Sequence, residues 1–263
     1  LTLAGTATVL VSTGVVTYGP IATLEYNTTN ARTVTSEEWV ISFTASGGVV
    51  INTTQNVTLN SAKAFNNSVP LTVNSGGKLL LSTFLLTLNG DLINNGGSIT
   101  GTTGGVTIAG TVPQNIGAFS TTGTILMVKT AGTATFTGPV SGGALTINGT
   151  GGTLNLGSGF AHSLSGIVTL SNGILNGSSS RLNVNATSAT AWNGTGTNFI
   201  AGTGTVNFGG AAQTLATASI FNNLIFSNSG INTLNGIPTI NGVLSMEGTA
   251  TVSAVPSYGS AAT

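Results

Sequence analysis

The chain has 263 residues, and its charges are few and balanced, with five Lys or Arg against five Asp or Glu. This balance excludes nucleic-acid binding, because phosphate contacts need clustered cations, and 40% apolar residues exclude disorder, which combines low hydrophobicity with net charge. Apolar runs of only a few residues predict no membrane insertion, and the absence of cysteine excludes disulfide bonds and thiolate metal sites.

The abundant residue types favour an all-β chain. Gly occurs 39 times, and Thr, Asn and Ser take the places that Lys and Glu occupy in ordinary proteins. Exposed helical faces need the strong helix formers Glu, Lys, Arg and Gln, which are scarce in this sequence. The β-branched residues and turn formers that replace them are typical of strands and tight turns.

The beginning of the chain returns near its end. Residues 1–9 (LTLAGTATV) and residues 244–252 (LSMEGTATV) share six of nine identities, and residues 16–19 (VTYG) are echoed by residues 256–259 (PSYG). A tail that restarts the head has the form of one period of a tandem array. We therefore interpret residues 1–263 as one continuous period of a longer array, with neighbouring copies of the repeat joined end to end.

One segment, residues 18–39, departs from the pattern of the rest. It holds four of the ten charged residues, Glu25, Arg32, Glu37 and Glu38, together with three aromatic residues. We expect a junction or a protruding loop here. Its aromatic rings would form a platform on which a sugar ring stacks, with charged side chains beside it. This hypothesis of a glycan or partner contact involves Tyr18, Glu25, Tyr26, Arg32 and Trp39.

A four-residue pattern recurs along the chain: an apolar residue, then Thr, Asn or Ser, then a second apolar residue, then usually a small or polar one. Because side chains alternate along a strand, both apolar residues lie on one face and the polar residue on the other. Each copy therefore predicts one short strand. The copies begin at Val57, Leu71, Leu86, Val106, Leu145, Leu154, Val168, Leu182 and Val206.

Two arrangements of these strands have to be weighed. Asn-Gly occurs eight times, and this strong hairpin signal favours tandem antiparallel β-sandwich modules. Residues 231–248, however, contain three six-residue units in succession, which leave about four residues per strand, short for a free-standing antiparallel sheet. In a parallel β-solenoid each unit is one side of a turn, and Asn-Gly is a left-handed corner. We predict a parallel β-solenoid (β-helix) rod and keep the sandwich as the alternative.

The solenoid has an expected size. About 20 residues per turn and a rise of about 4.8 Å per turn give a rod about 60 Å long. Val, Ile, Leu and Phe would fill the core, and Trp192 would pack in the core or at a corner. Neither end of the sequence reads as a cap, because both carry the repeating pattern, so we expect neighbouring copies to cover them.

Residues for catalysis are scarce. Glu25 with Glu37 or Glu38 is the one carboxylate pair that could converge, as glycoside hydrolysis requires, and nothing in their spacing requires that they do. His162 is the single histidine, and we interpret it as a polar residue on a face of the solenoid. We therefore predict no enzyme, no catalytic residue, no cofactor and no metal site.

The repeats resemble those of a known class of surface protein. Residues 144–157 (ALTINGTGGTLNLG), 24–27 (LEYN) and 47–52 (GGVVIN) resemble the β-strand-repeat segments of giant secreted bacterial surface proteins, such as adhesins and gliding-type filaments. The resemblance implies an extracellular or cell-surface location and a non-enzymatic structural module that extends and stiffens a filament or giant adhesin. A glycan-binding adhesive module, an ice-binding solenoid and a degenerate polysaccharide-processing β-helix stay open as alternatives.

Overall fold

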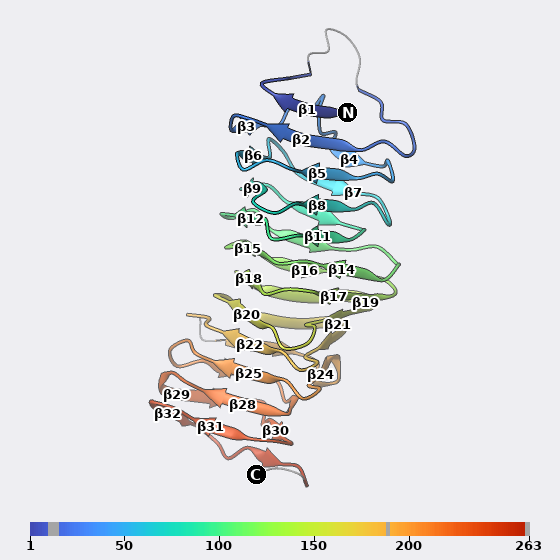
Figure 1. Cartoon of the computed structure of the whole chain (residues 1–263). Helices are drawn as coiled ribbons and strands as arrows, with labels where there is room; N and C mark the ends of the chain where they lie inside the picture. The colour runs from blue at the N-terminus through green and yellow to red at the C-terminus, as the bar shows by residue number, and fades with distance from the viewer. Residues whose placement is uncertain (10–15, 188–189, 261–263) are drawn as a thin grey trace.

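A computed structural model describes residues 1–9, 16–187 and 190–260. The chain forms a rod of about twelve stacked turns, with the N-terminal turn at one end and the C-terminal turn at the other (Figure 1). All strand pairings in the described residues are parallel. The predicted parallel β-solenoid is therefore confirmed, and the antiparallel sandwich is wrong.

Successive strands along the chain pass to three faces in rotation, so that each face is a ladder of strands from successive turns. Face 1 consists of β1 (Thr2–Gly5), β2 (Leu24–Thr28), β5 (Val49–Ile51), β8 (Leu71–Val73), β11 (Leu92–Asn94), β14 (Gln114–Ile116), β17 (Thr133–Phe136), the second halves of β19 (Leu145–Asn155) and β21 (Val168–Asn176), β24 (Phe199–Ile200), β27 (Ile220–Phe221), β30 (Thr239–Ile240) and β33 (Ser257–Tyr258). Face 2 consists of β3 (Arg32–Thr33), β6 (Asn56–Thr58), β9 (Lys78–Ser82), β12 (Ser98–Gly101), β15 (Phe119–Thr121), β18 (Val140–Gly142), β20 (Ala161–Leu164), β22 (Arg181–Val184), β25 (Thr205–Phe208), β28 (Asn223–Phe226) and β31 (Leu244–Met246). Face 3 consists of β4 (Ser42–Phe43), β7 (Lys63–Phe65), β10 (Leu86–Leu88), β13 (Val106–Ile108), β16 (Ile125–Met127), the first halves of β19 and β21, β23 (Thr190–Gly194), β26 (Thr214–Leu215), β29 (Ser229–Leu234) and β32 (Thr249–Val252).

The length of a turn is close to the expected value. Paired residues in successive turns are from 18 positions apart, as for Thr205 and Asn223, to 25 positions apart, as for Leu24 and Val49. The three six-residue units of residues 231–248 supply β29, β30 and β31, one strand on each face. Each unit is one side of a turn, as predicted.

Alternation of apolar and polar residues explains the core. Leu24, Val49 and Leu71 pair in succession on face 1, and their side chains are fully buried. Each such burial contributes roughly 1.5–3 kcal/mol, so every added turn stabilises its neighbours. Trp192 is also fully buried, and its ring centre lies 5.0 Å from that of Phe199, which confirms the packing role predicted for it.

The prediction that Asn-Gly marks left-handed corners is wrong for most copies. Only Gly96, Gly173 and Gly194 among the eight have a positive φ, and Gly173 and Gly194 lie within strands. At the other Asn-Gly positions the glycine is needed because a neighbouring segment leaves no room for a side chain. A Cβ on Gly149 would lie 2.1 Å from the carbonyl oxygen of Lys129, so the neighbouring turn passes too close for any side chain.

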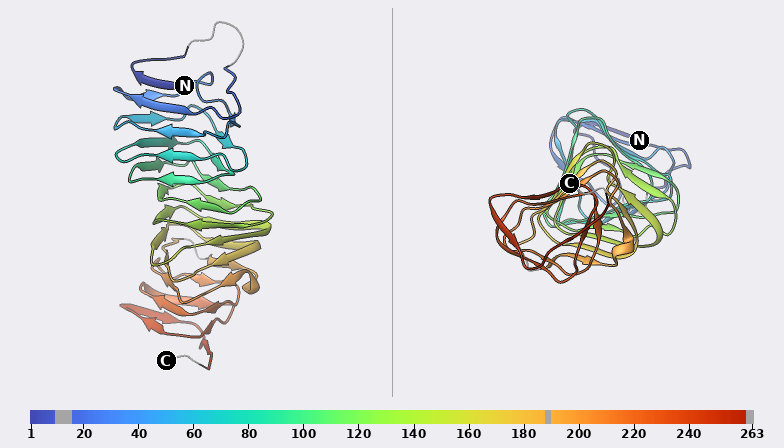
Figure 2. Two further views of the ribbon diagram at one scale, coloured as in Figure 1. Left: turned by 45° about the vertical axis from the view of Figure 1, so that its right-hand side comes forward. Right: turned by 90° about the horizontal axis from the view of Figure 1, so that it is seen from below.

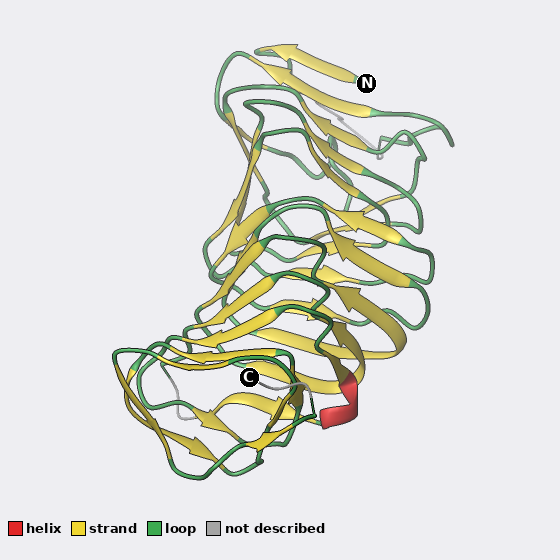
Figure 3. Ribbon diagram, turned by 60° about the horizontal axis from the view of Figure 1, so that its bottom comes forward, coloured by secondary structure: helices red, strands yellow, loops and turns green. Residues whose placement is uncertain are grey.

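The stack is not straight. In the end view of Figure 2 the C-terminal turns are displaced sideways from the N-terminal turns. One helical segment occurs in the described residues, the 3-10 turn η1 (Gly196–Asn198), on the side of the rod (Figure 3). No helix in the described part of the chain is long and apolar enough to span a membrane.

Candidate functional site

Two of the three aromatic residues of the 18–39 segment lie inside the rod, and the third, Tyr18, is partly buried. Tyr26 in β2 and Trp39 are both fully buried, with ring centres 6.0 Å apart, and Trp39 also packs against Phe65 in β7 at 5.9 Å. Sugar stacking needs a ring face that is open to solvent. The structure therefore overturns the predicted platform for Tyr26 and Trp39. Within this segment, β2 and β3 belong to the ladders of faces 1 and 2.

The charges of this segment pair with one another. Arg32 pairs with Val57 in the ladder and thus takes an inward position, where its guanidinium forms an ion pair with the buried carboxylate of Glu38. Arg32 Nη1 also donates to the carbonyl oxygen of Ala7 at 2.6 Å, and its guanidinium carbon lies 5.5 Å from the ring centre of Tyr26. The guanidinium is used in holding the first turns together.

Glu38 is fixed by a short turn of the chain. Its backbone N–H donates to the hydroxyl of Thr35 at 3.2 Å, and its carboxylate accepts from the N–H of Thr35 at 3.4 Å. This pair of bonds has the pattern of a capping box.

Two further side chains bind the backbone of this turn. Tyr18 donates its hydroxyl to the carbonyl oxygen of Glu38, and Lys63 donates its ammonium to the carbonyl oxygen of Trp39. Burial raises the pKa of Tyr18 to about 12 and lowers the pKa of Lys63 to about 8. We call Tyr18, Arg32, Glu38 and Lys63 the N-terminal polar cluster.

Glu25 lies apart from this cluster. Its carboxylate accepts from the hydroxyl of Thr2 at 3.1 Å and from the side-chain amide of Asn52 at 3.0 Å. Asn74 and Asn95 continue the row, each donating to the asparagine of the preceding turn at 3.3 and 3.2 Å. Glu25 thus begins an outer ladder of amides, whereas Glu38 is inside the rod, and the two carboxylates share no partner.

The interpretation of His162 as a residue on an outer face is wrong, because its side chain is in the core. Its Nδ1 accepts from the N–H of Val140 at 3.2 Å, which leaves the proton on Nε2 to donate to the carbonyl oxygen of Leu156 at 2.8 Å. Burial lowers the pKa of His162. Its place two positions before the buried Leu164 in β20 is the signal that could have assigned it to the inner face.

The sequence analysis did not identify a second buried polar group, which is centred on Lys129. Lys129 is fully buried and donates to the carbonyl oxygen of Val112 at 2.8 Å and to the side-chain oxygen of Gln114 at 2.7 Å. Gln114 in turn donates to the carbonyl oxygen of Gly90 at 2.8 Å. Burial lowers the pKa of Lys129. These contacts bridge successive turns.

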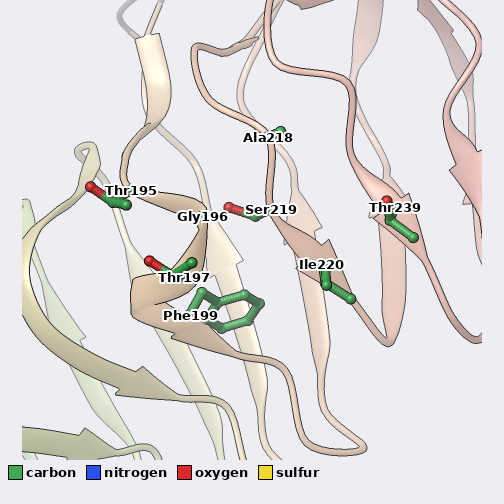
Figure 4. Close-up of a pocket in the computed structure, with 8 residues that line it drawn as sticks. All are labelled: Thr195, Gly196, Thr197, Phe199, Ala218, Ser219, Ile220 and Thr239. Carbon is green, nitrogen blue, oxygen red and sulfur yellow. The ribbon is translucent and has the colours of Figure 1, made fainter.

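The described residues also form a cavity, which sequence reasoning did not find. Its volume is about 320 Å³, and it opens on face 1 beside η1 (Figure 4). The ring of Phe199 lies at its centre, Ile220 is half-exposed at its edge, and none of the lining residues is charged. The lining residues are Thr195, Gly196, Thr197, Phe199, Ala218, Ser219, Ile220 and Thr239.

In the described residues, no group of three or more His, Cys, Asp or Glu side chains comes together. In comparisons with known proteins, neither a family model nor a curated protein nor a solved structure matches this chain. The geometry of the rod is thus the basis for any functional argument.

Proposed function

We propose that the chain is a non-enzymatic structural module of a secreted bacterial filament or giant adhesin, located outside the cell and extending and stiffening the fibre. The observation that carries the proposal is the ladder of face 2. It runs through eleven strands without interruption, from Arg32–Thr33 to Leu244–Met246. Its hydrogen bonds run along the rod, because paired strands lie in successive turns, so an axial load is shared among many backbone contacts.

The polar residues inside the rod support the same role. Arg32, Lys129 and His162 occupy positions at which an enzyme could hold reactive groups. Each instead donates to or accepts from the backbone of a neighbouring segment. Their contacts hold turns together, which is what a load-bearing rod requires.

Neighbouring copies, joined end to end, are the partners we propose. In the C-terminal turn Leu244 pairs with Leu224, and Met246 with Phe226. Leu224 and Phe226 are fully buried, whereas Met246 is 41% exposed and Leu244 is partly exposed. A further turn of a similar rod would cover these inward-facing side chains and extend the ladders.

Single-molecule stretching of residues 1–263 between two handles tests the mechanical role. Each turn of about 20 residues releases about 70 Å when it is drawn out, so we expect resisted extension with length gains of whole turns. Trp192→Ala, which leaves a cavity in the core, serves as the weakened control and should yield at lower force. Extension without resistance above that of an unstructured tether would overturn the proposal.

Antibody labelling of the source cells tests the location. Labelling of intact cells supports an extracellular module. Labelling that requires permeabilised cells contradicts it.

A further inference from the structure

The ladder of face 1 is interrupted at one place. Leu175 in β21 pairs with Phe199 in β24, and Ile220 in β27 pairs with Thr239 in β30, but the described residues show no pairing between β24 and β27. Face 1 is thereby divided into a long sheet and a three-stranded sheet. The 3-10 turn η1 directly precedes β24, so two departures from the repeat coincide at this point.

The cavity lies at this interruption. Its lining residues come from residues 195–199, which include η1 and the start of β24, on one side, and from residues 218–220 and Thr239, at β27 and β30, on the other (Figure 4). In repeat proteins, insertions into the repeat often lie on the binding face. A ligand here would contact two adjacent turns together.

The base of the cavity is a cluster of packed aromatic rings. The ring centre of Phe199 lies 5.0 Å from that of Trp192 and 5.5 Å from that of Phe221. The indole N–H of Trp192 donates to the hydroxyl oxygen of Ser219 at 3.0 Å. Because Ser219 accepts this bond, its own hydroxyl hydrogen is available to donate to another acceptor. The aromatic packing holds Phe199 and Ser219 in place before any ligand arrives.

The chemistry of the lining selects a class of ligand. A charged ligand would lose hydration without gaining an opposite charge, which is costly. Apolar surface from Phe199 and Ile220 lies beside hydroxyls, and such a mixture suits a molecule that has both C–H faces and hydroxyl groups. The hydroxyls belong to Thr195, Thr197, Ser219 and Thr239.

We infer that the cavity between β24 and β27 is a binding subsite for a neutral carbohydrate. Its volume of about 320 Å³ lies at the small end of the range for ligand pockets, which fits a short segment of a glycan. The subsite is distinct from the 18–39 segment. It does not depend on the proposed mechanical role, because the rod can bear load with the cavity empty.

Oligosaccharide binding by residues 1–263 tests the subsite. An array of neutral and charged oligosaccharides identifies the ligand, and calorimetric titration of the best neutral one gives its affinity. Thr197→Glu places bulk and charge in the cavity from the exposed η1. Thr124→Glu makes the same change at an exposed threonine on another face and serves as the matched control.

We expect the parent chain and Thr124→Glu to bind a neutral oligosaccharide equally, and Thr197→Glu to bind it at least tenfold more weakly, with equal thermal stability of all three. Equal binding by Thr197→Glu would overturn the inference. It would also fail if only charged oligosaccharides or apolar peptides bind, or if no neutral oligosaccharide binds the parent chain. Stretching experiments are unaffected by any of these outcomes, so they judge the mechanical role separately.

Discussion

The ammonium group of Lys129 lies 2.7 Å from the side-chain oxygen of Gln114, and both side chains are buried inside the rod. The ammonium has a further acceptor in the carbonyl oxygen of Val112. Among the described residues, Lys129 is one of three charged residues that are buried in the rod, together with Glu38 and Lys63. The contact connects β14 with the segment between β16 and β17, and β17 is the strand stacked on β14 in the following turn.

Loss of this contact should destabilise the rod. We expect Lys129→Met to lower the free energy of unfolding by about 1–3 kcal/mol, because it leaves buried acceptors on Gln114 and Val112 without a donor. Gln114→Leu should have a similar cost. Urea unfolding of the single and double variants forms a thermodynamic cycle. Additive costs would show that the two side chains do not stabilise each other.

Acid should weaken the rod through His162. Its folded pKa lies below the ordinary value of about 6.5, so the unfolded chain takes up a proton first as the pH falls. The free energy of unfolding therefore keeps its full value above pH 6.5 and declines as the pH falls below that value. Thermal unfolding between pH 7 and pH 5 measures the decline.

His162→Leu is the control for this pH dependence. Since His162 is the single histidine and carboxylates ordinarily titrate near pH 4, the variant should show a flat profile over the same range. An equal decline in the variant would assign the effect to other groups.

The N-terminal polar cluster should behave as a unit. Arg32→Met leaves the carboxylate of Glu38 buried without its cation, and breaking a buried ion pair in this way costs about 3–5 kcal/mol. Hydrogen exchange of the amides in β2 and β3 should accelerate in Arg32→Met. In the double variant with Glu38→Gln, part of the protection should return. No recovery in the double variant would contradict a direct pairing.

The close approach of turns at Gly149 gives a fourth prediction. A Cβ there would meet the carbonyl oxygen of Lys129 at 2.1 Å, so Gly149→Ala should force the turns apart and cost about 1–3 kcal/mol. Gly19 provides the control, because a Cβ at that position would meet no atom within 4 Å, and Gly19→Ala should be neutral or slightly stabilising. Equal thermal midpoints for the two variants would contradict the tight stacking.

The sequence alone predicts the repeating strands, but it does not predict which polar side chains lie inside the rod. Alternation in segments such as β8 predicts which side chains point inward, because apolar identity and position agree. Residue type and position disagree for four residues. A charged or polar residue type predicts exposure to solvent, whereas the position in the strand pattern points inward, for Arg32, Lys63, Lys129 and His162. Backbone acceptors of Arg32, Lys63 and Lys129 lie on other turns, and a single sequence does not show which turns lie adjacent.

The corners and the cavity were missed for a related reason. The Asn-Gly pattern correctly marked positions that need glycine but gave the wrong reason, because Gly149 is required by the close approach of the preceding turn and not by its own φ. The cavity depends on the missing pairing between β24 and β27, which is a relation between turns. Local patterns in residues 195–199 and 218–220 give no sign of it.

The register of the ladder also limits how this chain can change in length. Leu71 and Leu92 occupy equivalent places in successive turns, so excision of residues 71–91 would join Pro70 to Leu92 and leave every remaining side chain on its present side of the wall. Removal of one residue within a strand would reverse inside and outside for the rest of that strand. Gain or loss of whole circuits is therefore the route by which such a rod can be lengthened or shortened without a new core.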